Sequence, residues 1–181
     1  MGKDTSISQE SYDRMTMYIG ASGWGEFIIG EEPEIIKLQP DELLIVPAGT
    51  LCGMQTSNGI VYTEIICTGK DINMNANVKT NEVFALKNLI SYEEGSIANM
   101  DVVSTPDMKY VLMAFDDGTG LTPHRAPGNA IVFALEGKAT IGYEGKDYEL
   151  SEGECFRFEK NGLHSVTANG KFKMALLLVL E

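Results

Sequence analysis

His124 and His164 are the only two histidines of the 181-residue chain, and they are its strongest candidates for chemistry. Imidazoles titrate near neutral pH and ligate metals, so a pair of them can begin a metal site, orient a polar ligand or move a proton. His124 opens the stretch HRAPGNAIVFALEG. Ala126 and Ala130 follow two and six residues later, where a metal site of that spacing would require a histidine and a carboxylate.

The segments around these histidines have the pattern of β-strands. Short apolar runs such as KYVLMAF, AIVFALEG and ATIGYEG are rich in valine, isoleucine, phenylalanine and tyrosine, and glycine or Asn-Gly often bounds them. This pattern predicts an antiparallel sandwich or barrel. Because side chains alternate along a strand, Ala126, Ala130 and Val132 share the side onto which His124 leads.

The chain also contains an internal repeat. When its two halves are offset by 112 residues without a gap, Leu38 falls on Leu150, Glu42 on Glu154 and Cys52 on His164. The same offset predicts three further matches in the first half: Tyr12 with His124, Arg14 with Ala126, and Tyr18 with Ala130. No set of metal ligands results there, although Arg14 with the two tyrosines could form a carboxylate-binding corner.

A polar, asparagine-rich stretch, GKDINMNANVKTN, separates the two halves. We therefore predict an incomplete N-terminal repeat over residues 1–70, a linker over 71–82 and a C-terminal domain over 83–181. The first repeat is incomplete because counterparts of the strands between residue 84 and about residue 117 would fall before Met1.

Two motifs resemble those of the cupin superfamily. Cupins carry G-x5-H-x-H-x3/4-E-x6-G, and Gly118, His124, Ala126, Ala130 and Gly137 reproduce that spacing. Their second motif, G-x5-P-x-G-x2-H-x3-N, is matched in spacing by residues 153–168, with alanine in place of the closing asparagine. The H-x-A-P phrase is also similar to a group of small bacterial cupins of unassigned function.

The resemblance implies an all-β bicupin, two jelly-roll (double-stranded β-helix) barrels with any site inside a barrel. Of the four usual metal ligands it implies only His124 and His164. A divalent metal (Zn, Fe, Mn or Ni) would then be weakly held unless a third donor such as Met113, Glu154 or Cys155 approaches. We expect His124, His164, Ala126, Ala130 and Val132 to contact a ligand, the alanines leaving volume beside the imidazoles.

Three functions are compatible with these residues. The first is a small-molecule-binding protein with a partial metal site in the C-terminal barrel. The second is a metal-dependent isomerase, decarboxylase or oxygenase acting on a small organic acid or sugar derivative. The third is a non-catalytic structural or regulatory module, which the degenerate first half favours.

Composition restricts the partners. The net charge is −12, spread evenly along the chain, so nucleic acid and anionic membranes are not expected partners. Cys52, Cys67 and Cys155 have no CxxC spacing, and the amino terminus lacks an apolar signal core, so we expect a cytoplasmic protein. The run FKMALLLVL is apolar on both strand faces and requires cover on both, which predicts a homodimer or a fused pseudo-dimer.

Overall fold

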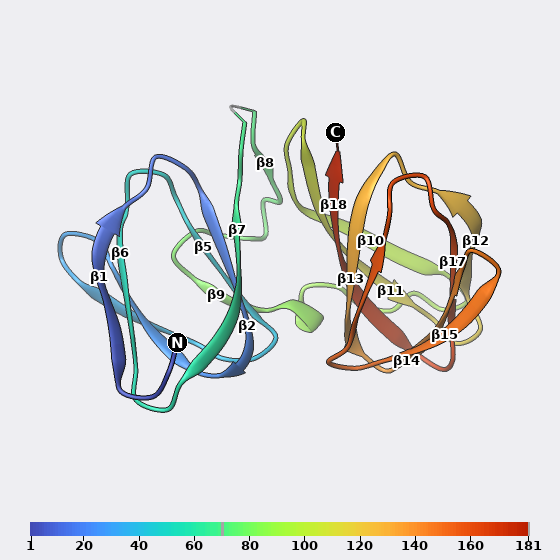
Figure 1. Cartoon of the computed structure of the whole chain (residues 1–181), viewed down its shortest axis with the longest axis horizontal. Helices are drawn as coiled ribbons and strands as arrows, with labels where there is room; N and C mark the ends of the chain where they lie inside the picture. Colours follow the sequence, from blue (N-terminus) through green and yellow to red (C-terminus); the bar gives the residue numbers. More distant parts are fainter. Residues whose placement is uncertain (70, 181) are drawn as a thin grey trace. The chain divides into compact units, whose positions relative to one another are not determined.

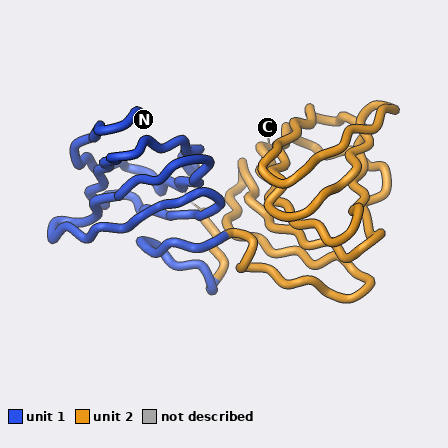
Figure 2. Tube along the Cα trace, turned by 90° about the horizontal axis from the view of Figure 1, so that it is seen from below, with its two compact units in different colours: residues 1–68, 76–85 blue, residues 69–75, 86–181 orange. Residues whose placement is uncertain are grey.

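The computed structural model describes residues 1–69 and 71–180. The chain divides into two compact units, residues 1–68 with 76–85, and residues 69–75 with the chain from residue 86 onward (Figure 2). The described residues are nearly all in strands and turns, with one short 3-10 helix, η1 (Leu86–Asn88). The predicted all-β architecture is therefore confirmed. Across this described part, no helix has the length and apolar character needed to cross a membrane.

The first unit consists of two antiparallel sheets with strand orders β1-β6-β3-β4 and β7-β2-β5-β9 (Figure 1). Its strands are β1 (Thr5–Ser11), β2 (Thr16–Gly23), β3 (Gly25–Ile29), β4 (Glu34–Leu38), β5 (Glu42–Val46), β6 (Leu51–Thr56), β7 (Ile60–Ile66) and β9 (Val83–Ala85). Alternate side chains of both sheets meet in one buried cluster that includes Phe27, Leu44 and Met54. Burial of these apolar side chains is what holds the two sheets together.

The second unit has sheets ordered β16-β13-β18-β11-β10-β8 and β12-β17-β14-β15. Its strands are β8 (Asn73–Met74), β10 (Ile97–Ser104), β11 (Met108–Phe115), β12 (Gly120–Arg125), β13 (Gly128–Glu136), β14 (Lys138–Tyr143), β15 (Lys146–Ser151), β16 (Cys155–Phe158), β17 (Leu163–Ala168) and β18 (Phe172–Leu180). Its core cluster includes Phe115, Ile141, Phe158 and Phe172.

The two units repeat one strand arrangement, as the sequence predicts. The sheet β1-β6-β3-β4 corresponds to β12-β17-β14-β15, and β7-β2-β5 corresponds to β18-β13-β16. Beyond the β3–β4 turn the counterparts are 112 residues apart. The Glu42 carboxylate accepts the Gln39 amide at 2.8 Å, and the Glu154 carboxylate accepts the Ser151 amide at 2.8 Å.

Before that turn, however, the ungapped match is wrong by two residues. The β3–β4 turn spans residues 30–33, whereas the β14–β15 turn spans only 144–145. Cys52 consequently pairs with Glu10 as His164 pairs with His124, so Tyr12 is not the counterpart of His124. For the same reason the other two predicted matches are wrong: Arg14 is not the counterpart of Ala126, and Tyr18 is not the counterpart of Ala130.

The first repeat is incomplete, as predicted. In the second unit β18 pairs with β11, which pairs in turn with β10. The first unit has no such hairpin among its described strands, so β7 is an edge strand of its own sheet. The predicted linker is also not a free connection: β8 pairs with β10 in the second unit, and residues 76–85, which contain the whole of β9, belong to the first. The division of the chain therefore differs from the boundaries 1–70, 71–82 and 83–181.

Candidate functional site

His124 and His164 lie opposite each other on neighbouring antiparallel strands. His124 of β12 pairs with His164 of β17, and the centroids of the two rings are 4.3 Å apart with an interplanar angle of 55°. The structure thus brings together two imidazoles that are 40 residues apart in the chain.

A β-bulge in β12 directs His124 toward its partner. Leu121 pairs with Val166 and His124 with His164, so two residues of β12, Thr122 and Pro123, face the single Ser165 of β17. Leu121 packs against the core of the unit. In a regular strand His124, three positions after Leu121, would point to the opposite face of the sheet. The extra residue of the bulge returns the His124 side chain to the same face as Leu121.

Backbone carbonyls orient both rings. Nδ1 of His124 lies 2.9 Å from the Thr122 oxygen, and Nδ1 of His164 lies 2.8 Å from the Gly162 oxygen. Because a carbonyl oxygen can only accept, Nδ1 is the donor in each ring. In the neutral tautomer Nε2 then carries a lone pair. Within the described part of the chain, neither Nε2 has a hydrogen-bond partner.

The two rings differ in their environment. His164 is only 7% exposed and stacks on Phe158, with ring centroids 4.2 Å apart, whereas His124 is exposed. Burial lowers the pKa of His164 from its ordinary value, and the neighbouring His124 lowers it further, while the hydrogen bond to Gly162 opposes the shift. His164 is therefore a neutral imidazole near pH 7. The pair lies at the rim of the barrel, with one ring inside and one in solvent.

The three small side chains predicted to contact a ligand have different positions. Ala130 and Val132 are 3% and 1% exposed and belong to the core cluster. Ala130 pairs with Phe158 and Val132 with Phe156, so aromatic rings occupy the volume expected to be open beside the alanines. Ala126 is half-buried, and its carbonyl accepts the Asn161 amide at 2.9 Å.

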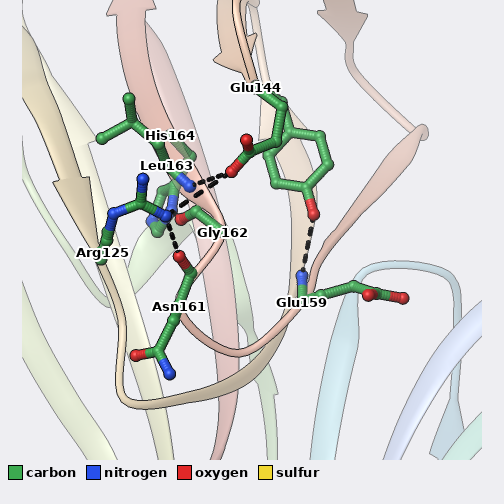
Figure 3. A network of polar contacts seen from close by, with 8 residues as sticks. Arg125, Glu144, Glu159, Asn161, Gly162, Leu163 and His164 are labelled. Carbon is green, nitrogen blue, oxygen red and sulfur yellow. Dashed lines mark hydrogen bonds and ion pairs between the residues drawn. The ribbon is translucent and has the colours of Figure 1, made fainter.

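A polar network holds residues 159–163 beside His164 (Figure 3). The Arg125 guanidinium donates to the Asn161 carbonyl and lies 3.7 Å from the Glu144 carboxylate. Glu144 also accepts the Leu163 amide at 2.6 Å, directly before His164. Sequence analysis missed both charged residues. Only the position of Arg125 next to His124 could have indicated it, and nothing in the sequence indicates Glu144.

A depression of about 250 Å³ opens beside this network. Its lining includes Pro123 of β12, Tyr143 of β14, and Leu163 and His164 of β17. Asp147 and Lys146 line it as well and supply one charge of each sign. The depression could therefore hold a small polar molecule near His164.

The donor set does not fit a tightly held metal. Cys155 is exposed and alternates in β16 with the core-facing Phe156, so it lies on the outer face. Glu154 uses its carboxylate in the turn before β16, and Met113 packs on the core. Among the residues that the structure describes, no three His, Cys, Asp or Glu side chains cluster as metal ligands would. Structural and catalytic zinc sites use three or four protein ligands.

Comparison with known proteins agrees with this geometry. Residues 111–180, from β11 to β18 and including both histidines, match the cupin domain model. These residues form a cupin domain. The Cupin 2 conserved barrel domain protein from Leptotrichia buccalis is 27% identical and superimposes with a TM-score of 0.85, over 99% of this chain and 80% of that one.

More distant cupin folds are similar in structure alone. The SPY1581 protein of unknown function from Streptococcus pyogenes is 24% identical, with a TM-score of 0.57 over 60% of this chain and 96% of that one. Salicylate 1,2-dioxygenase from Pseudaminobacter salicylatoxidans is 11% identical, with a TM-score of 0.69 over 99% of this chain and 68% of that chain. A search of curated proteins finds no match.

Proposed function

We propose that this protein is a bicupin whose C-terminal barrel binds a small organic molecule through Nε2 of His124 and His164. The observation that carries the proposal is the facing pair of rings, 4.3 Å apart, each oriented through Nδ1 by a backbone carbonyl. A neutral His164 accepts a hydrogen bond from a hydroxyl or N–H group of the ligand. The adjoining depression of about 250 Å³ provides room for a molecule of metabolite size.

The polar network makes this a preorganised site. Glu144 and Arg125 bind the backbone on either side of Gly162, whose carbonyl orients His164. A ring fixed in this way loses little freedom when it binds a ligand. The small side chains contribute differently: Ala130 and Val132 belong to the same buried cluster as Phe158, and the Ala126 carbonyl accepts the backbone amide of Asn161.

A divalent metal (Zn, Fe, Mn or Ni) would have only the two imidazole nitrogens as protein ligands. Solvent would complete its coordination, and such an ion exchanges readily. Ligand binding by hydrogen bonds to Nε2 does not depend on it.

The second candidate is an enzyme that moves a proton, such as an isomerase or a decarboxylase acting on a small organic acid or sugar derivative. A buried neutral imidazole beside an exposed one favours this enzyme. His164 could accept a proton from the substrate, and the neighbouring His124 is open to solvent. An oxygenase has less support because it depends on a redox metal, for which a third ligand is missing.

Native mass spectrometry and elemental analysis of the full chain test these functions. We expect the mildly purified protein to carry a small organic molecule and to contain less than one metal ion per chain. The double variant H124A/H164A should lose the organic molecule. C155S is the matched control, since its thiol lies on the outer face of β16, and it should retain the ligand. Stoichiometric metal lost only in the double variant would favour the enzyme. Protein without ligand or metal would favour a structural or regulatory module.

We also propose a homodimer in the reducing cytoplasm. An outer groove of about 340 Å³ on β13 and β18 is lined by Ile131, Leu177 and Val179, and Val179 is 41% exposed. An identical chain covering this groove would shield apolar surface that a monomer leaves in water. Light scattering after size exclusion should give twice 19.8 kDa, and a single species at 19.8 kDa would exclude the dimer.

The three unpaired cysteines support a reducing compartment.

A further inference from the structure

The first unit contains a cavity of its own inside its barrel. The cavity has a volume of about 60 Å³, enough for roughly four to six water-sized groups. It lies where the second unit has its histidine pair, because Cys52, the counterpart of His164, is part of its lining. The function proposed above makes no use of it.

Aromatic rings form most of the wall. The ring centroid of Tyr18 is 4.8 Å from that of Phe27 and 5.8 Å from that of Tyr62, and Phe27 and Tyr62 are 6.4 Å apart. Tyr12, which is 43% exposed, stands at the opening. Rings arranged in this way present π-faces and phenolic oxygens to one small volume, an arrangement that attracts cations.

The charge of the cavity has one sign. Glu64 lines it, and in the described chain its carboxylate has no hydrogen-bond or ion-pair partner. None of the described lining residues is basic. Arg14, which could have formed a carboxylate-binding corner with Tyr12 and Tyr18, is half-exposed, pairs with Asp13 at 3.8 Å and is not among the lining residues.

The field of Glu64 reaches across the cavity. Burial, and then Glu64, raise the pKa of Tyr62, and the same two causes raise the pKa of Cys52 to about 11. Burial likewise raises the pKa of Tyr18, with smaller contributions from Cys52 and Glu64. Tyr18, Tyr62 and Cys52 therefore stay protonated at neutral pH, and Glu64 is the one carboxylic side chain among the described lining residues.

We infer that this cavity binds a small organic ammonium ion, with its alkyl part against Tyr18, Phe27 and Tyr62 and its nitrogen directed toward Glu64. The ammonium N–H groups donate to the carboxylate and to phenolic oxygens, which have lone pairs to accept them. An organic acid would meet Glu64 without a compensating cation, and a neutral alcohol would gain nothing from the charge.

Titration of the full chain with ethylammonium chloride, followed by amide NMR shifts, tests this inference. We expect saturable shifts in strands β6 and β7, at residues 52–54 and 62–64. Ethanol and acetate serve as neutral and anionic probes of similar size, and each should bind at least about tenfold more weakly than ethylammonium.

Two variants locate the site. Glu64→Gln keeps the shape of the side chain and removes its charge, and should weaken ethylammonium at least about tenfold. Tyr62→Phe keeps the ring and removes one acceptor, and should weaken it several-fold. Glu34→Gln on β4 is the matched control, an exposed carboxylate outside the cavity, and should leave the affinity unchanged. Equal affinities of Glu64→Gln and the parent protein, or equal binding of acetate, would overturn the inference. H124A/H164A should not alter this binding, so the two sites are tested independently.

Discussion

The ring of His164 lies nearly parallel to that of Phe158, with centroids 4.2 Å apart and an interplanar angle of 23°. Phe158 is 1% exposed and is fixed by the core of the second unit. The stack therefore shields one face of the imidazole from water, while the other face meets His124. The contact connects the packing of the barrel to the acid–base behaviour of the candidate site.

The first prediction concerns pH. Because the pKa of His164 is lowered in the folded protein, the unfolded chain, with its ordinary value near 6.5, takes up the proton first as the pH falls. The contribution of His164 to stability is thus complete above about pH 6.5 and is lost below it, until the pH passes the lowered folded pKa. Urea unfolding at about pH 8 and about pH 5 should show this loss.

Carboxylates also affect acid stability, so the part due to His164 must be isolated. His164→Gln has no proton to gain, and the stability difference between the parent and this variant should shrink toward the acid side. A difference that is independent of pH would contradict a lowered pKa for His164.

The second prediction concerns the β13–β14 connection. Gly137 has φ 77°, and a Cβ there would lie 2.0 Å from the Lys171 carbonyl oxygen. Gly145 has nearly the same φ, 79°, with open space around it. Gly145→Ala should lower the free energy of unfolding by about 1 kcal/mol, because alanine is strained in the left-handed backbone conformation. Gly137→Ala should cost at least about 2 kcal/mol more, because the backbone itself must move. Equal unfolding free energies for the two variants would refute the close approach.

The third prediction concerns a buried lysine. The Lys173 ammonium donates to the Lys87 carbonyl at 2.7 Å, lies 3.9 Å from Glu136 and sits 4.7 Å from the Tyr92 ring centroid. Lys173→Met retains the aliphatic volume and removes the charged donor, which should cost about 2 kcal/mol. Amide exchange in η1 should accelerate, since the donor to its Lys87 carbonyl is lost. Lys171→Met, an exposed lysine beside the same tyrosine, should change neither measurement.

The fourth prediction concerns thiol reactivity. Burial raises the pKa of Cys52 and of Cys67 to about 11, and their exposed fractions are 7% and 1%. Cys155 is exposed on the outer face of β16. Maleimide labelling followed by mass spectrometry should modify Cys155 alone in the native protein, and the other two only after unfolding. Labelling of Cys52 at a comparable native rate would show that the cavity of the first unit opens.

Strand patterns are local, and the sequence predicts them well. Alternation correctly places Ala130 and Val132 toward the core, and motif spacing identifies the barrel that contains His124 and His164. The repeat could be recognised for the same reason, since Glu42 and Glu154 each close the same four-residue turn.

Other features depend on contacts between distant segments. The bulge at Thr122 and Pro123 exists only relative to the partner strand, so alternation within β12 cannot reveal it. The arrangement of Glu144, Arg125 and Asn161 likewise joins three separate turns and strand ends. Two extra residues in the β3–β4 turn shift the match of every residue before them, so Arg14 is not the counterpart of Ala126 and does not line the cavity. Glu64 follows that turn and lines the cavity through the pairing of β7 with β2.

By itself, the sequence determined the strand class, the doubled architecture and the identity of the two imidazoles, because all three depend on residue type and spacing along one chain. Tertiary structure alone decided that one imidazole is buried against Phe158 while the other remains in water, and that the exposed Glu64 lines a cavity of the first unit beside aromatic rings. Burial and charge at a site are set by side chains brought from many strands, and their joint packing is not written in any one segment.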